Sequence, residues 1–266
     1  TFICSSTFIL NQISDEESNA GNERLFIIGK HISLEKSQLV AKILLIVGFI
    51  LSLVTIWFTT ILVGCIYLIW GIIYNQKPFN WKKQPVLGWL ANSMVGGLLF
   101  AVGWFVVMNN QLNYGATILD RALFEYMFPY LLGFSSIAML LSTLEASPRD
   151  IERGDKTFSI LYGEILTLIL ALIFIGVAFI VALYHGDPLA STAALVSIPF
   201  FGFSVIRRFE KDILRAIRYP ILILNFFTLS IYPWLFIPIT ITFYLSKYYY
   251  WHRFDLHYPT FLVDHD

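Results

Sequence analysis

Oxygen-bearing side chains recur at helical spacing near the start of the chain. Asn11, Asp15 and Asn19 are four residues apart, so on a helix they share one face. That face begins where the apolar run 1–10 ends. Carboxylate and amide oxygens are ligands for a hard cation such as Mg²⁺. The same residue types also suit the solvated end of a helix, where they cap backbone groups. The spacing leaves both interpretations open.

A second group of reactive residue types lies at 143–158, which is dense in both signs of charge. Asp150, Glu152 and Asp155 could bind a metal ion, and Arg149 and Lys156 could bind phosphate oxygens. The alternative is a surface loop in which these charges pair with one another.

The polar segment between them, 74–85, carries Lys82 and Lys83 in its second half. Two prolines, Pro78 and Pro85, and an aromatic pair predict a structured turn rather than a loose link. The two lysines are either anion ligands or anchors at a membrane surface.

These polar segments interrupt a chain that is otherwise strongly apolar. Of its 266 residues, 57% are hydrophobic and 14% are charged, whereas a soluble domain carries about 25% charged residues. So few charges cannot cover a water-exposed surface, so most of the outer surface must face lipid. The net charge is zero, which argues against nucleic acid as a partner.

The apolar segments are long enough to cross a bilayer, which takes about 20 residues as a helix. Residues 43–73 contain no charge, and we expect two short spans there that join at Thr59–Thr60. The expected spans are 38–57, 60–75, 87–108, 123–145, 160–184, 189–206 and 220–246, after the tail of an earlier helix at 1–12. Backbone groups in lipid must be satisfied internally, so the predicted fold is an all-α polytopic membrane helical bundle.

Positive charge is concentrated in alternate connections between these spans. The connections 11–37, 76–86, 146–159 and 207–219, with Lys42 at a helix start, hold 15 of the 18 lysines and arginines. The positive-inside rule makes that face of a multi-pass membrane protein cytoplasmic.

Two carboxylate clusters and a basic loop therefore share one face, at the ends of different helices. Mg²⁺ bound to a pyrophosphate needs this combination, with hard oxygens for the metal and cations for the remaining phosphate charge.

In these segments the chain resembles the UbiA superfamily of intramembrane prenyltransferases. Residues 11–19 are similar to the family's first acidic motif, Asn-(Asp/Gln)-x-x-Asp-x-x-x-Asp. Residues 74–85 resemble its Tyr-Ser-x-Pro-Pro-x-Arg-Leu-Lys-x-x-Pro loop at Tyr74, Pro78, Lys82 and Pro85. Residues 143–158 are similar to Thr-x-x-Asp-x-x-x-Asp-x-x-x-Gly-Asp-Lys-Thr-Phe.

The resemblance implies one transmembrane domain, 1–266, with a nine-helix fold of which the first helix and most of the second are missing. An odd number of helices puts the C-terminus on the side opposite to the polar loops. The implied activity is transfer of an isoprenoid chain from its pyrophosphate, the donor, to an aromatic or other lipophilic acceptor, as in quinone or prenyl-lipid biosynthesis. The transfer is expected to be Mg²⁺-dependent and to occur at the cytoplasmic face.

The resemblance also implies a role for each matching residue. Asp15 and Asp150 are the expected catalytic acids, and together with Asn19 they are the expected Mg²⁺ ligands. Asn11, Lys82 and Lys156 are expected to bind the pyrophosphate.

Three positions depart from the family pattern. Asn19 replaces the last acid of the first motif, Ala146 replaces the first acid of the second, and Asn80 replaces an arginine. These departures motivate an alternative, a non-catalytic homologue that binds a prenyl lipid. A transporter is a further alternative. It would use ionisable groups at membrane depth, for which only Glu125 and Glu164 are candidates.

Overall fold

The computed structural model describes residues 1–18, 28–29, 31–55, 57–112, 121–144 and 156–255, with the side chains of 15–18 and 108–112 left out. All the elements in these ranges are helical, and the prediction of an all-α membrane bundle is confirmed. In chain order they are α1 (Phe2–Ser18), α2 (Leu34–Leu53), α3 (Trp57–Ile66), the π-helix η1 (Tyr67–Ile73), the 3₁₀ turn η2 (Trp81–Lys83), α4 (Pro85–Leu112), α5 (Arg121–Leu144), α7 (Phe158–Tyr162), α8 (Glu164–Tyr184), α9 (Pro188–Arg207), α10 (Glu210–Ile231), the 3₁₀ turn η3 (Pro233–Leu235) and α11 (Phe236–Phe254).

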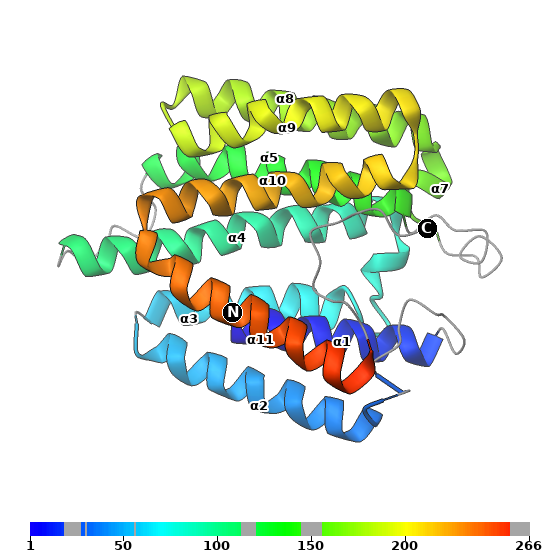
Figure 1. Cartoon of the computed structure of the whole chain (residues 1–266), viewed down its shortest axis with the longest axis vertical. Coiled ribbons are helices and arrows are strands. Elements are labelled where there is room, and N and C mark those ends of the chain that lie inside the picture. The colour runs from blue at the N-terminus through cyan, green and yellow to red at the C-terminus, as the bar shows by residue number, and fades with distance from the viewer. Residues whose placement is uncertain (19–27, 30, 56, 113–120, 145–155, 256–266) are drawn as a thin grey trace.

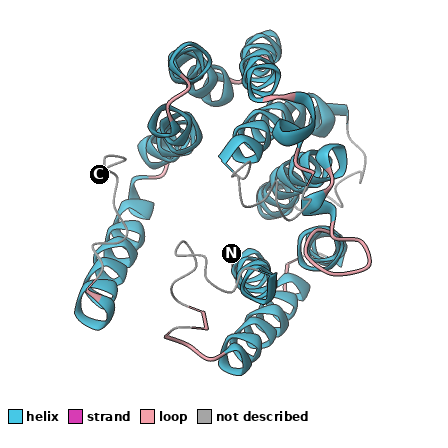
Figure 2. Cartoon of the chain, turned by 90° about the vertical axis from the view of Figure 1, so that its right-hand side faces the viewer, coloured by secondary structure: helices cyan, strands magenta, loops and turns pink. Residues whose placement is uncertain are grey.

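The long helices run roughly side by side between two ends of the molecule (Figure 1). Six of them are long and apolar enough to cross a membrane, namely α2, α4, α5, α8, α9 and α10, and α3 with η1 forms a shorter apolar helix. We call the end at which α1 stops and α2, α4 and α8 begin the polar end, and the opposite end the far end. Seen end-on, the helices are arranged around a central region (Figure 2).

The core combines large apolar side chains with alanines where helices meet. Met139, Leu140, Leu168 and Phe201 are buried between α5, α8, α9 and α10, beside alanines such as Ala171. A second buried group joins α1, α3, η1 and α4. Small residues let helix backbones approach closely in lipid, where the hydrophobic effect between helices is weak.

Two glycines mark the closest crossings. A Cβ added at Gly48 of α2 would lie 2.7 Å from Ile3 Cδ1 on α1. A Cβ added at Gly96 of α4 would lie 2.2 Å from Phe134 Cγ on α5. Near the second crossing the hydroxyl of Ser135 donates to the hydroxyl of Ser93 at 2.8 Å, joining α4 to α5. These contacts fix the spacing of the helices that carry the polar segments.

The predicted junction at Thr59–Thr60 is wrong by a few residues, because both threonines lie inside α3. The chain turns just before them instead, after Leu53. The Thr55 hydroxyl donates to the carbonyl of Ser52 at 2.7 Å, and the Ser52 hydroxyl donates to Thr60 at 3.2 Å. Thr55 and Thr60 thus link the turn to the start of α3. Thr59 and Thr60 do not form the turn themselves.

The predicted loop 207–219 is mostly helix, because α9 ends at Arg207 and α10 already begins at Glu210. The first turns of α10 are polar but helical, and buried Asp212 accepts from Arg215 at 3.2 Å within the same helix.

The predicted span 220–246 is not one helix, because α10 ends before 232–235 and α11 begins after it. Tyr232 leaves helical geometry with φ −119° and ψ 72°, as expected of a residue before proline. Pro233 follows and lacks an N–H for a continuing helix.

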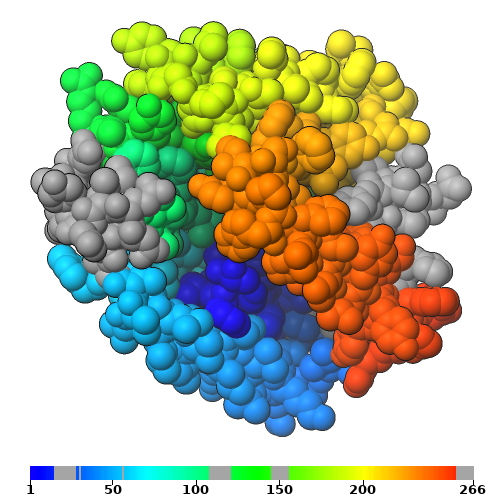
Figure 3. Space-filling view, turned by 60° about the vertical axis from the view of Figure 1, so that its left-hand side comes forward, coloured from blue at the N-terminus to red at the C-terminus, as the bar shows by residue number. Residues whose placement is uncertain are grey.

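Because of this division an additional helix, α11, returns toward the polar end. The ring of Phe254 lies 4.7 Å from that of His31, just before α2. The C-terminal end of α11 is therefore at the polar end, whereas the sequence predicts the C-terminus on the opposite side; residues 256–266 themselves lie outside the described part of the chain. In the space-filling view the surface is hollowed over α1, between α2, α3 and the orange to red helices α10 and α11 (Figure 3).

Candidate functional site

The first acidic segment lies on the last two turns of α1, at the polar end. Asn11 is half-buried, and the backbone of Asp15 follows it one helical turn later, on the same face. The apolar residues before them, such as buried Ile3, anchor the helix in the bundle. The backbone of α1 therefore places Asn11 and Asp15 where the apolar part of the helix ends.

The segment 74–84, which we call the basic turn, is held in shape by hydrogen bonds of its backbone and of the Asn75 side chain. The amide of Asn75 donates from Nδ2 to the carbonyl of Trp70 at 2.6 Å. The N–H of Lys82 donates to the carbonyl of Tyr74 at 3.2 Å, and that of Asn80 donates to the carbonyl of Gln76 at 2.9 Å. The segment is a structured turn, as its prolines and aromatic residues predicted.

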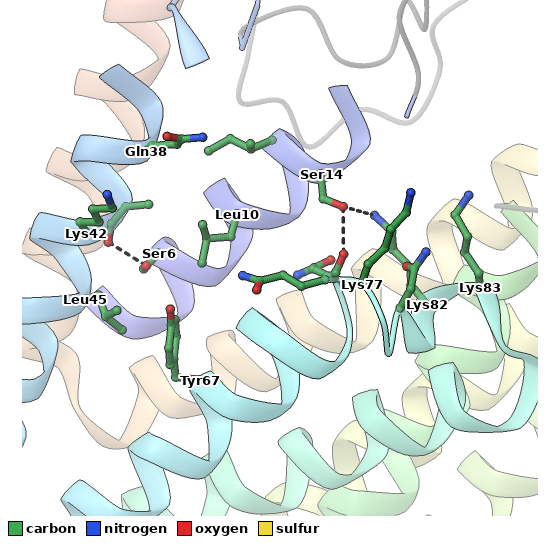
Figure 4. A pocket seen from close by; sticks show the side chains of 15 residues that line it. Ser6, Leu10, Ser14, Gln38, Lys42, Leu45, Tyr67, Lys77, Lys82 and Lys83 are labelled. Carbon is green, nitrogen blue, oxygen red and sulfur yellow. Dashed lines mark hydrogen bonds between the residues drawn. The ribbon is translucent and has the colours of Figure 1, made fainter. Parts of the chain in front are cut away.

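Ser14 joins this turn to α1. Its hydroxyl donates to the carbonyl of Asn75 at 3.0 Å and accepts from the ammonium of Lys82 at 3.2 Å (Figure 4). Ser14 precedes Asp15, so the half-buried Lys82 is fixed beside the acidic segment.

The polar segment 143–158 approaches the basic turn at Lys156. Its backbone N–H donates to the carbonyl of Lys83 at 3.3 Å. The next residue, Thr157, is buried and caps α7 by accepting from the N–H of Ile160 at 3.4 Å. The end of α1, the basic turn and the start of α7 thus meet at the polar end.

Three predicted site residues have described side chains: Asn11, Lys82 and Lys156. The side chain of Asp15 and the whole of Asn19 and Asp150 lie outside the described part of the chain. Within the part that is described, no three His, Cys, Asp or Glu side chains gather as metal ligands. The assignments of Asp15, Asn19 and Asp150 to the metal stay predictions.

A polar group below the basic turn joins η1 to α4. Trp70 Nε1 donates to the amide oxygen of Asn92 at 3.0 Å, and Asn92 Nδ2 donates to the Tyr74 hydroxyl at 3.4 Å. The ring of Phe8 lies 5.8 Å from that of Trp70. Aromatic rings from α1 and η1 thus lie farther from the polar end than the basic turn does.

A cavity of about 670 Å³ opens beside the site, between α1, α2 and the basic turn. On α1 its lining residues are Ser6, Leu10, Ile13 and Ser14 (Figure 4). One residue along a helix is a rotation of about 100°, so this face is turned away from that of Asn11 and Asp15. Asn11 does not line the cavity, whereas Lys82, a predicted pyrophosphate ligand, does.

A second cavity, of about 370 Å³, lies at mid-depth among α5, α8, α9 and α10. Its surface is almost entirely apolar, with residues such as Ile137, Ile175 and Leu224. Ser136, Ser197 and Asn225 also line it, and each donates to a carbonyl of its own helix. Such a space accepts a hydrocarbon chain without leaving polar groups unsatisfied.

The sequence pattern did not single out Ser14 or Lys77. Ser14 lies inside the first acidic segment, but a serine there has no sequence signal that distinguishes a connecting role. Lys77 has no sequence signal beyond its positive charge in a loop, and its place on the cavity wall depends on how the turn folds back over α1.

Comparison with known proteins adds a family match. The model of the UbiA prenyltransferase family matches residues 1–218, which includes all three polar segments and leaves out α11. No solved structure matches the chain significantly.

Two curated proteins of Humulus lupulus are similar over part of their length. They are a chloroplastic 2-acylphloroglucinol 4-prenyltransferase and a second 2-acylphloroglucinol 4-prenyltransferase, each 27% identical over 165 residues. The matched segment is 59% of this chain and 37% or 36% of the relatives. The comparison therefore spans little more than a third of either relative.

Proposed function

The chain belongs to the UbiA prenyltransferase family, and from this membership we propose that it transfers an isoprenoid chain from its pyrophosphate to an aromatic or other lipophilic acceptor. The proposed site is at the polar end, which we assign to the cytoplasmic face because it holds most of the lysines and arginines. We propose a single transmembrane domain that extends beyond the family match to residue 266.

One observation carries the proposal: three separate segments converge at the mouth of an apolar bundle. Ser14 holds Lys82 beside the acidic face of α1, and Lys83 holds the backbone of Lys156. A pyrophosphate with a hydrocarbon tail needs cations at the surface and apolar space below. The apolar cavity among α5, α8, α9 and α10 supports the second requirement.

The donor set at the end of α1 fits Mg²⁺. Asn11 and Asp15 stand one turn apart on the backbone of α1, and amide and carboxylate groups are the ligand type that Mg²⁺ prefers. We propose Asp15, Asn19 and Asp150 as its ligands. When bound, Mg²⁺ would offset the negative charge of the pyrophosphate leaving group.

In the proposed reaction, Asn11, Lys82 and Lys156 hold the phosphate oxygens by hydrogen bonds that strengthen as charge develops on them. The allylic C–O bond breaks, and its electron pair leaves with the pyrophosphate. Aromatic rings such as Trp70 can stabilise the allylic cation from their faces. The acceptor then supplies the electron pair of the new bond and loses a proton.

Replacement of the two acids tests the proposal. In the full-length protein, Asp15→Asn and Asp150→Asn should each lower Mg²⁺-dependent prenyl transfer roughly 100-fold or more, because each removes a carboxylate proposed to hold the Mg²⁺ that offsets the leaving-group charge. The rate is measured with a set of prenyl pyrophosphates and aromatic acceptors. Asp255→Asn, at the exposed C-terminal cap of α11, is the matched control and should retain the wild-type rate. Unchanged rates in both site variants would show that the site is assigned wrongly.

A second candidate function is binding of a prenyl lipid without turnover. The observations that favour it are Asn19 and Ala146, which stand where the family pattern has acids. This candidate predicts that a prenyl lipid co-purifies with the protein and that no pyrophosphate is released from any donor.

The described charges give little support to a transporter. Glu125 lies near the start of α5 and pairs with Arg121 at 2.6 Å, and Glu164 is the first residue of α8. Both acids are near helix ends rather than at membrane depth.

A further inference from the structure

The cavity beside the acidic face has the lining of a site for an anionic amphiphile. Four lysines reach it from two elements: Lys42 from α2, and Lys77, Lys82 and Lys83 from the basic turn (Figure 4). Deeper along α1 and α2 the lining includes Leu10 and Leu45. A cationic mouth above an apolar wall matches a ligand that joins a phosphate to a hydrocarbon chain.

Lys42 is the informative residue, because its surroundings face lipid. Its neighbours on α2, Leu39, Val40 and Ile43, are 58%, 45% and 50% exposed. A lysine among lipid-facing residues needs an anionic partner or must extend its ammonium to the membrane surface. Within the described part of the chain, no carboxylate forms an ion pair with Lys42 or Lys77.

The cavity wall also carries amide side chains. Asn75 is 5% exposed, and both Asn75 and Asn80 line the cavity. Each has a buried amide oxygen that accepts no hydrogen bond from a described residue. Both oxygens are closed off from the cavity space, so the two side chains give this side of the wall polar character without a direct contact to a ligand.

We propose that the part of this cavity around Lys42 and Lys77 binds the headgroup of an anionic phospholipid, beside Lys82, which we assign to the pyrophosphate. Basic pockets between transmembrane helices at the cytoplasmic side recognise lipid headgroups in this way. The exposed apolar face of α2 leaves the hydrocarbon chains of such a lipid in the bilayer. The proposal does not depend on prenyl transfer, because neither Lys42 nor Lys77 is among the residues proposed to bind the pyrophosphate or Mg²⁺.

The test compares lipid binding by matched lysine variants of the full-length protein. Phosphatidylglycerol is titrated into protein in phosphatidylcholine nanodiscs or micelles, and bound lipid is counted by native mass spectrometry. A lysine near a membrane surface contributes about 1 kcal/mol to anionic lipid binding, or about fivefold in affinity. Lys42→Gln with Lys77→Gln should therefore weaken phosphatidylglycerol binding roughly 25-fold.

Two controls separate charge at this cavity from charge in general. Lys36→Gln with Lys247→Gln removes two exposed lysines that do not line the cavity and should change binding less than about twofold. Lys42→Arg with Lys77→Arg keeps the charge and should restore binding, which also excludes misfolding as the cause of the loss. Equal binding by the wild type and the glutamine pair would overturn the proposal.

Added inorganic pyrophosphate distinguishes the two possible sources of phosphate. It should not displace phosphatidylglycerol from the wild type, and the donor KM should be the same in the glutamine pair as in the wild type. Displacement by pyrophosphate, or a donor KM raised by the glutamine pair, would show that the cavity belongs to the pyrophosphate site and would overturn the phospholipid proposal.

Discussion

Ser14 is bonded to residues that lie 61 and 68 positions later in the chain. It is a positioning residue, since it fixes Lys82 and the carbonyl of Asn75 without a proposed contact to substrate. A lysine held by a hydrogen bond loses less conformational entropy when it binds an anion than a free lysine does.

Removal of the Ser14 hydroxyl should therefore weaken donor binding more than turnover. We expect Ser14→Ala to raise the donor KM about fivefold, which is the equivalent of one hydrogen bond of about 1 kcal/mol, with little change in kcat. Steady-state kinetics across donor concentrations measure the two separately. Ser14→Thr should rescue the KM, and Ser230→Ala, whose hydroxyl bonds only within α10, is the control. A change in kcat alone would contradict a positioning role.

At the scale of elements, the crossing of α4 and α5 depends on Gly96, which has no side chain. Gly96→Ala places a Cβ within 2.2 Å of Phe134, so the helices must separate or the ring must move. We expect a loss of about 1–3 kcal/mol in stability, as for other overpacked sites. Thermal unfolding in detergent measures this loss.

Gly103 on the same helix is the matched control, because a Cβ there meets nothing within 4 Å. Gly103→Ala should leave stability unchanged or raise it by up to about 1 kcal/mol through helix propensity. If both variants unfolded at the same temperature, the close approach of α4 and α5 would not be the reason that position 96 requires a glycine.

At the scale of the whole molecule, α11 decides on which side the described chain ends. Phe254 contacts His31, so Asp255 is expected on the same side of the membrane as Lys77. In sealed vesicles, and with Cys4 and Cys65 replaced by serine, Asp255→Cys and Lys77→Cys should react with an impermeant maleimide from one common side. Tyr232→Cys, exposed at the far end, should react from the other side. Labelling of positions 255 and 232 from the same side would contradict this topology.

The sequence was sufficient where a single physical requirement acts along the chain. The apolar runs set most of the spans, because each backbone polar group in lipid must be bonded within its own helix. It was insufficient where a turn depends on contacts. The turn before α3 is bonded through Ser52, Thr55 and Thr60, and the first turns of α10 bury Asp212 beside Arg215.

By itself, then, the sequence determined an all-α membrane bundle and the segments that carry the polar chemistry. It also indicated the family, because the polar motifs survive as short local patterns. Only the tertiary structure decided that Lys82 is held by Ser14, that Lys83 and Lys156 meet, and that a lysine-lined cavity lies on a separate face of α1. Such pairings join residues distant in the chain, and their geometry depends on how whole helices pack rather than on any local pattern.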